Sequence, residues 1–312
     1  MNILSRITSP LSIAISSGIL LLMSFFSFFK NKSAETKQEG KPTRTTQQGT
    51  DSTYHVNDLL IQFPEQEKDE LYHLMNSEEN LKFLQENPIL KKQVDGVEGC
   101  FVLENVITPL ECKLFVEISE KMGYKPSPLS VLAGKFDTSV INNSTKQIRD
   151  SERILTDLPE KVIEVLNKRI EHLLPEKVDI YGEEWTLRKN TPINERIRFN
   201  KYGVTQKFGP HMDAGYRKND HEMTQLTIIF YLNEDFKGGE TTFFPGGRRH
   251  LLEEATVQEV RIVPKIGLVS VFFQNGKLNH RHEGSPVIEG FKYIIRSDIA
   301  YIKSSWLESQ NQ

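Results

Sequence analysis

The chain has 312 residues, a formal net charge of −3, 38% hydrophobic residues and 26% charged residues. This length suits one large domain or two ordinary ones, and the composition suits a globular protein that buries a core. The small negative charge gives no indication of a nucleic-acid partner. With only two cysteines, Cys100 and Cys112, the sequence excludes a disulfide-rich scaffold and a cysteine-based zinc module. The two thiols could form one disulfide, but two small buried residues are the simpler interpretation.

The N-terminal region contains an uncharged, largely apolar run from Leu11 to Phe29, between Arg6 and Lys30. About 20 such residues span a bilayer as a helix, whereas a signal peptide has a shorter apolar region and a small-residue cleavage site. We therefore predict a single-pass membrane anchor in residues 1–30, with an uncleaved signal as the alternative. The endoplasmic reticulum is one expected location. Flanking charges and Asn-X-Ser/Thr sequons do not settle the side on which the remaining chain lies.

Two further segments precede the main body of the chain. Residues 31–56 are almost wholly polar and cannot bury enough apolar surface to become ordered, so we predict a disordered linker. In residues 57–95, leucines recur at helical spacing between Pro64 and Pro88. We expect this segment to form a helical cap.

The next residues alternate between one strand and two helices. Cys100–Glu104 has the composition of a strand, and Thr108 with Pro109 provides an N-cap and a first helical residue for a helix to about Met122. A second amphipathic helix is predicted over Pro159–Leu174. The polar residues Ser127 to Arg149 between the two helices are expected to form a mobile loop.

After Pro175, short β-like runs follow one another with turns between them. They are Ile197–Lys201, Gln206–His211, Leu226–Leu232, Thr241–Phe244, Val260–Val263, Leu268–Phe273 and Tyr293–Ile302. Such a succession indicates a β-sandwich or jelly-roll barrel, and the helices before it would pack on one face. We expect an α+β domain over residues 96–304, with its core in residues 194–302.

A metal site is the first chemical hypothesis that the sequence supports. His211 and Asp213 are two positions apart, so on an extended strand their side chains point to the same side. A third ligand would complete the 2-His-1-carboxylate face that holds non-haem Fe(II) and leaves positions open. Both His280 and His282 could supply it, and spacing alone does not separate them. An H-x-D pair by itself also occurs by chance in many proteins.

A second polar cluster lies on the last predicted strand. Lys292, Arg296 and Asp298 alternate onto one face. A cation buried inside a barrel needs a partner, because an uncompensated buried charge is very costly. A dicarboxylic co-substrate bound at iron would be such a partner. A cation–aspartate pair on an exposed sheet face is the alternative.

These pieces together resemble the Fe(II)/2-oxoglutarate dioxygenases of the prolyl 4-hydroxylase type. The matching stretches, in the order of the family, are Tyr202-Gly203, Gly209–Asp213, Leu226–Asn233, Gly238–Phe244, His282–Val287 and Gly290–Tyr301. Each stretch is weak alone, but their joint occurrence in this order is specific. The resemblance implies a double-stranded β-helix (jelly roll) core with packed N-terminal helices, preceded here by the single predicted N-terminal membrane-spanning helix.

The resemblance also implies roles for individual residues. It places His211, Asp213 and His282 on the iron ligands, which favours His282 over His280. Lys292 falls on the residue that pairs with the distal carboxylate of 2-oxoglutarate, and Tyr202 falls on a tyrosine of the same pocket. Arg296 matches a recurrent arginine, which we group with the cofactor-binding residues without an individual role. The implied cofactors are Fe(II), 2-oxoglutarate and O2, with ascorbate as the reductant.

The implied reaction is hydroxylation of a C–H bond with decarboxylation of 2-oxoglutarate to succinate, on a prolyl residue in a protein or peptide. The Ser127–Arg149 loop resembles the mobile lid of these enzymes. A charged insertion after Pro245 and a short N-terminal segment make a collagen-like specificity doubtful. Two alternatives stay open: the same chemistry on a non-prolyl substrate, and a non-catalytic jelly-roll binding module. The intact ligand set argues against the binding module.

Overall fold

Two β-sheets form the centre of the structure, a computed structural model that describes residues 53–55, 60–127, 129–132, 135–137, 148–245 and 258–310. The larger sheet has, in spatial order, β2 (Leu90–Gln93), β3 (Phe101–Glu104), β17 (Val269–Phe273), β13 (Glu222–Tyr231), β20 (Lys292–Lys303), β11 (Arg196–Tyr202), β8 (Glu152–Asp157) and β4 (Lys125–Pro126). In the same sheet, β10 (Glu183–Leu187) pairs with β20 and with β9 (Lys177–Ile180). The smaller sheet has the order β16 (Val260–Ile262), β15 (Thr241–Phe244), β18 (Arg281–Gly284), β12 (Lys207–His211) and β7 (Arg149–Asp150).

The remaining described strands are short. β14 (Lys237–Gly238) pairs with β19 (Val287–Glu289), and β6 (Lys135–Asp137) lies between β1 (Thr53–His55) and β5 (Leu129–Leu132). Every strand predicted after Pro175 is present, with ends that differ by a few residues. Among the strands of four or more residues in the two larger sheets, the prediction missed β2, β8, β9, β10 and β18. Of these, β2 is exposed along its length, so its sequence lacks the apolar alternation on which the prediction relied.

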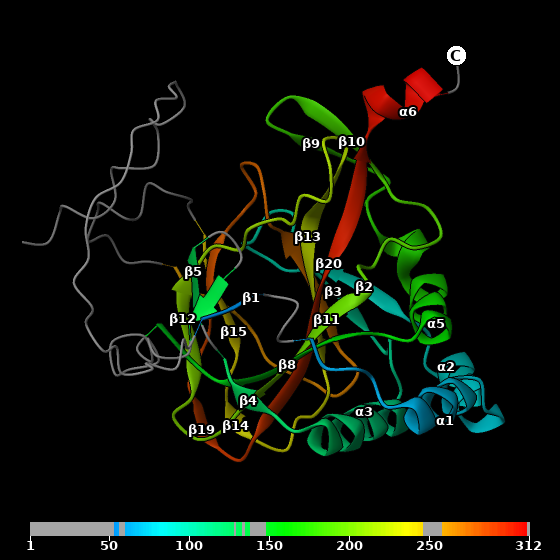
Figure 1. The fold of residues 1–312 in the computed structure, drawn as a ribbon, viewed down its shortest axis with the longest axis vertical. Helices are drawn as coiled ribbons and strands as arrows, with labels where there is room; N and C mark the ends of the chain where they lie inside the picture. The colour runs from blue at the N-terminus through cyan, green and yellow to red at the C-terminus, as the bar shows by residue number, and fades with distance from the viewer. Residues whose placement is uncertain are drawn as a thin grey trace, which may run out of the picture. The chain divides into compact units, whose positions relative to one another are not determined.

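The helices are α1 (Glu65–Met75), α2 (Glu78–Glu86), α3 (Pro109–Met122), α5 (Glu160–Ile170) with the 3-10 turn η2 (Glu171–Leu173), and α6 (Ser304–Gln310). α3 begins as predicted: Thr108 accepts from the backbone N–H of Glu111, and the Glu111 side chain accepts from the backbone N–H of Thr108. This reciprocal capping box satisfies two donors that a helix leaves without partners. Figure 1 shows α1, α2, α3 and α5 gathered on one side of the strands.

The larger sheet is buried on both faces, and its two faces have different partners. β13 is buried from Thr224 to Tyr231, with consecutive side chains pointing to opposite faces. Leu226, Ile228 and Phe230 join the cluster that includes helix residues such as Phe115 of α3. Ile229 and Tyr231 pack in a second cluster with residues of the smaller sheet. The two sheets thus enclose a jelly-roll core, and the helices cover the other face of the larger sheet, as an α+β domain requires.

The helical segment before the sheets belongs to the same core. Its apolar residues Leu71 and Met75 are completely buried in the cluster that underlies the larger sheet. Ser77 caps α2 by accepting from the backbone N–H of Asn80, which divides the predicted helical segment into two helices. Arg169 of α5 forms a bidentate ion pair with the buried Glu111 of α3, with both N–O distances 2.8 Å.

Several predicted features lie outside the described residues. They include the apolar run Leu11–Phe29, almost all of the 31–56 linker, and residues 246–257 of the insertion. Within the described part, no helix combines the length and apolar character needed to cross a bilayer. In the predicted loop Ser127–Arg149, the backbones of β5 and β6 pair as an antiparallel hairpin, so the loop is not wholly irregular. Its ends meet where Arg149 Nη1 donates to Ser127 Oγ at 3.3 Å.

Candidate active site

Three side chains that could bind one metal ion meet inside the jelly roll. His211 ends β12, Asp213 follows it, and His282 lies in β18. β12 and β18 are antiparallel neighbours in which His211 is the direct partner of His282, so two residues distant in sequence become adjacent. One ligand atom from each of the three lies within 4.8 Å of the others. Although β12 ends before Asp213, His211 Nε2 is 3.5 Å from Asp213 Oδ1.

Backbone carbonyl groups orient the two imidazole rings. His211 Nδ1 is 2.9 Å from Gly209 O, and His282 Nδ1 is 3.0 Å from His280 O. If each Nδ1 donates to its carbonyl, each Nε2 keeps a lone pair that faces the centre of the cluster. Burial lowers the pKa of His282 to about 4, against the opposing effect of the Asp213 charge, so this ring is neutral at pH 7. A neutral imidazole is the form that binds metals.

The Asp213 carboxylate is held on both of its oxygen atoms. Thr227 Oγ1 donates to Asp213 Oδ2 at 2.6 Å, and Arg296 Nη2 lies 3.0 Å from Asp213 Oδ1. Burial alone would raise the pKa of Asp213. The positive charge of Arg296 is the main effect that outweighs burial, and the pKa of Asp213 is held well below its usual range. Asp213 is therefore an anion with a fixed orientation.

A closed ring of polar side chains lies behind Asp213. Thr227 accepts from Gln274 Nε2 at 2.9 Å, and the same amide group donates to Asp298. Asp298 Oδ1 lies 3.6 Å from Arg296 Nη2, and the same nitrogen contacts Asp213, which closes the ring. Thr227, Gln274 and Asp298 are all buried. Because buried polar groups without partners are costly, the ring is stable only as a complete set.

Lys292 lies further along the same face of β20. It is 3% exposed, and its Nζ donates to the backbone carbonyl of Gly239 at 2.6 Å. Gly239 has φ +69°, and a Cβ at this position would be 3.1 Å from the Lys292 side chain, so glycine allows the close approach. Burial lowers the pKa of Lys292 to about 8. Among the described residues no carboxylate lies within ion-pair distance of this ammonium group, which suits it to bind an anion.

One cavity of about 70 Å³ joins all six predicted site residues. His211, Asp213, His282, Lys292, Tyr202 and Arg296 all line it. The structure brings His282, and not His280, to His211 and Asp213, because His280 Nε2 bonds instead to the backbone carbonyl of Glu98 at 2.8 Å. Arg296 contacts Asp213 and Asp298.

Several other residues of this site were not predicted from the sequence. Thr227 and Gln274 hold Asp213 in place, and Arg149, Arg153 and Arg198 line the same cavity. Thr227 is a polar residue within a buried, largely apolar run, and Gln274 directly follows another such run. These positions were the signals available in the sequence. Arg198 and Asn200 of β11 pair with Arg296 and Ile294 of β20, so a strand period of two could have placed Arg198 beside Arg296.

The donor set fits the groups that the resemblance implies. Two neutral imidazoles and one carboxylate are the protein ligands of the non-haem Fe(II) facial triad. The buried Lys292 ammonium fits one carboxylate of a dicarboxylic acid whose other end reaches the metal. Tyr202 and Tyr231 flank the Lys292 ammonium group, and their ring centres lie 5.5 Å and 5.6 Å from Lys292 Nζ.

Comparison with known proteins agrees with this chemistry. Residues 197–297 match the sequence model of the 2OG-Fe(II) oxygenase superfamily. The chain is 24% identical over 229 residues to a probable prolyl 4-hydroxylase 4 of Arabidopsis thaliana, covering 66% of this chain and 69% of that protein. It is also 24% identical over 228 residues to prolyl 4-hydroxylase 2 of the same plant, with the same coverage.

A solved structure of a viral collagen prolyl hydroxylase from Paramecium Bursaria Chlorella virus-1 aligns with 66% of this chain and 97% of its own, at 19% identity and a TM-score of 0.41. The superfamily match spans His211, Asp213 and His282, which the fold brings together. In sequence the chain is thus similar to the 2OG-Fe(II) oxygenase superfamily and, within it, to plant prolyl 4-hydroxylases.

Proposed function

We propose that the chain hydroxylates a prolyl residue of a protein or peptide, and that His211, Asp213 and His282 bind Fe(II). The single observation that carries this proposal is the placement of these three donors and the buried Lys292 ammonium in one cavity. The relatives named as prolyl 4-hydroxylases support the choice of a prolyl substrate. Bound Fe(II), 2-oxoglutarate and O2 supply the oxidising chemistry, which hydroxylates a C–H bond and releases succinate and carbon dioxide.

The residues of the chain bind and orient the reactants. Lys292 provides a fixed positive charge for the distal carboxylate of 2-oxoglutarate, so that its other end is directed to the metal. Arg296 and Thr227 hold the Asp213 carboxylate in one orientation. Phe208 stacks on the His211 ring, and Phe243 and Phe272 pack against the His282 ring, so the two imidazoles keep fixed orientations. Fixing ligands in advance lowers the reorganisation that catalysis would otherwise require.

Three further proposals concern the surroundings of the reaction. Ascorbate is proposed as the reductant that restores Fe(II), and the Ser127–Arg149 segment as the part that closes over the substrate.

The third proposal is membrane attachment through residues 1–30, which rests on the apolar run Leu11–Phe29 alone. Fractionation of cells that express the chain with and without residues 1–30 tests the attachment. Equal recovery of both forms in the soluble fraction would exclude it.

The reaction is tested by succinate formation from 2-oxoglutarate with added Fe(II), combined with mass spectrometry of proline-containing peptides. We expect turnover and a gain of one oxygen atom on proline in the wild type, and neither in Asp213→Ala. Asp220→Ala is the matched control, because Asp220 is an exposed aspartate outside the cavity. Equal succinate formation by wild type and Asp213→Ala would refute catalysis at this site. Succinate formation without modified proline would refute the prolyl substrate alone.

A further inference from the structure

A second and larger cavity opens beside the proposed iron site. It has a volume of about 330 Å³, within the range of sites that bind small molecules or side chains. Arg153 and Arg198 line both this cavity and the smaller one that contains His211, Asp213 and His282. The segment that follows Asp213 provides another wall through Tyr216 and Lys218. A group in the larger cavity would therefore lie next to any residue presented to the metal.

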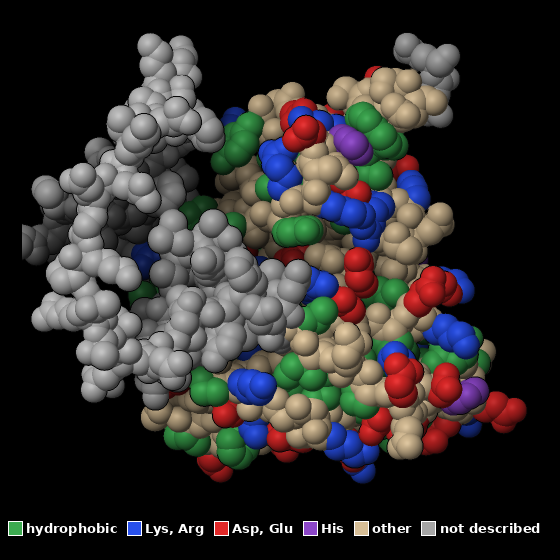
Figure 2. All heavy atoms as spheres, viewed as in Figure 1, with side chains coloured by type: hydrophobic (Ala, Val, Ile, Leu, Met, Phe, Trp, Pro, Cys, Tyr) green, Lys and Arg blue, Asp and Glu red, His purple; other side chains and the backbone are tan. Residues whose placement is uncertain are grey.

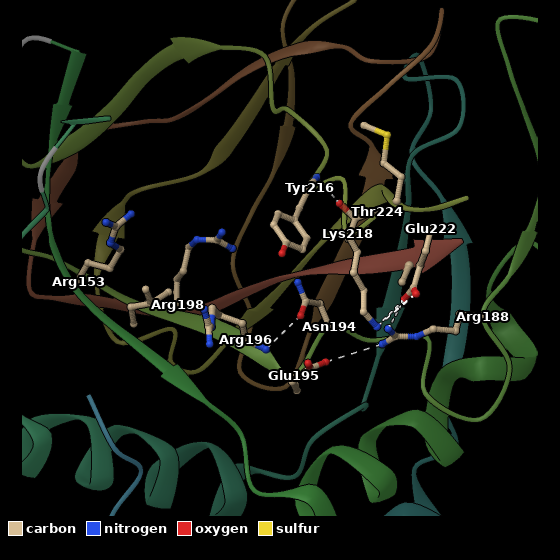
Figure 3. A pocket seen from close by; sticks show the side chains of 13 residues that line it. Arg153, Arg188, Asn194, Glu195, Arg196, Arg198, Tyr216, Lys218, Glu222 and Thr224 are labelled. Carbon is tan, nitrogen blue, oxygen red and sulfur yellow. Dashed lines mark hydrogen bonds and ion pairs between the residues drawn. The ribbon is translucent and has the colours of Figure 1, made fainter. Parts of the chain in front are cut away.

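Most of the charged side chains that line the larger cavity are basic. Its lining includes five basic side chains and two acidic ones, which are Arg153, Arg188, Arg196, Arg198, Lys218, Glu195 and Glu222. Figure 3 shows Arg153 and Arg198 on one side of the space and Lys218, Glu222 and Arg188 on the other. We call this space the cationic cavity.

Two of these cations, Arg188 and Lys218, share one acidic partner. Glu222 lies 2.7 Å from Arg188 and 3.2 Å from Lys218. Glu195 is more distant, 3.9 Å from Arg188. Arg196 has a close acid of its own, Asp157, at 2.9 Å.

The same sharing occurs at the junction of the two cavities. Asp298 lies 3.3 Å from Arg198 and 3.6 Å from Arg296, while the other acidic partner of Arg296 is the proposed metal ligand Asp213. The pKa of Arg153 is lowered to about 9, first by burial and then by the charges of Arg149, Arg198 and Arg296. Arg149, Arg153, Arg198 and Arg296 all line the smaller cavity, so four guanidinium groups meet near the junction. An anion at the junction would offset their positive charge.

The form of the cavity favours a peptide carboxylate over a nucleic acid. Leu155, Met223 and Tyr216 also line it, and their apolar surfaces can pack on the methylene groups of a side chain. Guanidinium groups bind carboxylates in a planar, bidentate manner. Nucleic-acid binding instead needs an extended basic surface, and the chain has a net charge of −3. On the face in Figure 2, Lys and Arg side chains are interspersed with Asp and Glu rather than forming one continuous patch.

Building on the proposed function, we propose that the cationic cavity binds an acidic side chain, Asp or Glu, adjacent to the residue that the substrate presents for hydroxylation. The substrate class is thus a peptide segment in which an acidic residue flanks the target residue. Arg153 and Arg198 contact its carboxylate at the junction, and Lys218 attracts it from the cavity rim. Charged contacts of this kind determine which partner binds more than how tightly any partner binds.

The test measures binding separately from turnover. Fluorescein-labelled peptides with blocked ends carry a central proline flanked by Glu on the N-terminal side, by Glu on the C-terminal side, or by Gln on both sides. Blocked ends ensure that only the side chain supplies the carboxylate. Anisotropy is recorded without oxygen, on the full chain with Fe(II) and 2-oxoglutarate. We expect one Glu peptide to bind about ten-fold more tightly than the Gln peptide, with a difference that shrinks as salt is added.

Lys218→Glu is the decisive variant because its side chain is 54% exposed, so the change should not disturb folding. It should abolish the preference for Glu, whereas Lys113→Glu, on the exposed surface of α3, should preserve it. Equal binding of Glu and Gln peptides, or an unchanged preference in Lys218→Glu, would overturn the inference. Tighter binding of a single-stranded oligonucleotide than of either Glu peptide, again sensitive to Lys218→Glu, would also overturn it. A Glu preference without hydroxylated proline would leave the inference standing and refute only the prolyl proposal.

Discussion

Thr227→Val removes one hydroxyl group from directly behind the Asp213 carboxylate. That hydroxyl donates to Asp213 Oδ2 at 2.6 Å and accepts from Gln274 Nε2 at 2.9 Å. Valine has nearly the same shape as threonine, so the change deletes two hydrogen bonds without opening a sizeable cavity. Asp213 keeps Arg296 at Oδ1 but loses the contact that fixes its other oxygen atom. We expect the carboxylate to bind the metal less tightly because it is no longer oriented in advance.

The size of the effect follows from the position of the hydroxyl group. Groups that orient metal ligands typically change metal affinity by about 10- to 100-fold, which corresponds to roughly 1.4–2.7 kcal/mol. Thr227 is completely buried, so water cannot replace its hydroxyl group without rearrangement. The free energy of unfolding should also fall, by about 1–3 kcal/mol, because Asp213 Oδ2 loses its donor.

The affinity is measured by anaerobic calorimetric titration with Co(II) in the presence of 2-oxoglutarate, which does not depend on turnover. Thr227→Ser keeps the hydroxyl group and should restore most of the metal affinity. Thr156→Val is the matched control, because Thr156 is also a completely buried strand threonine but its Oγ1 has no hydrogen-bond partner within the described part of the chain. Wild-type affinity in Thr227→Val would refute the reasoning. An equal loss in Thr227→Ser would also refute it, because packing and not the hydroxyl group would then be responsible.

Three further outcomes follow from the buried charges. Lys292→Ala should raise the 2-oxoglutarate concentration needed for half-maximal turnover by about 100-fold or more, since it leaves a carboxylate unpaired, while Co(II) affinity without 2-oxoglutarate stays within about two-fold. The pKa of Lys292 is lowered to about 8, so its ammonium is charged below that pH. The affinity for 2-oxoglutarate should therefore be full near pH 7 and fall as the pH rises above about 8, and a pH-independent affinity would contradict the role of Lys292. Glu111→Ala leaves Arg169 buried without its carboxylate and should lower the free energy of unfolding in urea by about 3–5 kcal/mol, against less than about 0.5 kcal/mol for the exposed Glu117→Ala.

The sequence was most informative where a local pattern alone determines the structure. The helix from Thr108 and the strand Thr241–Phe244 were predicted with almost correct ends, because a capping box and a buried β-branched or aromatic run are local signals. Strand β8 was missed because its neighbour β11 is remote in sequence and only their pairing defines it. The division of the predicted helical segment at Ser77 was also missed, although a serine N-cap is a local signal.

In the site, too, local patterns could be predicted from the sequence, but contacts between distant segments could not. His211 and Asp213 could be found because two positions on one chain segment suffice to suggest a shared face. His282 could be chosen over His280 only by resemblance, since the contact that turns His280 away is made by the carbonyl of distant Glu98. The ring through Thr227 and Gln274 joins two strands, and each residue alone is an ordinary polar residue at a buried position. The ring can therefore be recognised only once the pairing of the strands is known.

β20 shows why fold stability and site chemistry can be altered separately in this protein. Ile295 and Tyr301 lie in the cluster that packs against the helices, whereas Lys292 and Arg296 line the cavity on the opposite face. Replacing buried ion pairs with apolar residues is often neutral or stabilising, so the charges on the inner face are not needed for folding. Their retention inside the sheets is explained if they hold Asp213 and an anionic co-substrate. Replacing Arg296 and Asp298 with apolar residues of similar size should weaken metal binding, but the fold is preserved only if Gln274 and Arg198, which would lose Asp298 as their partner, are replaced with them.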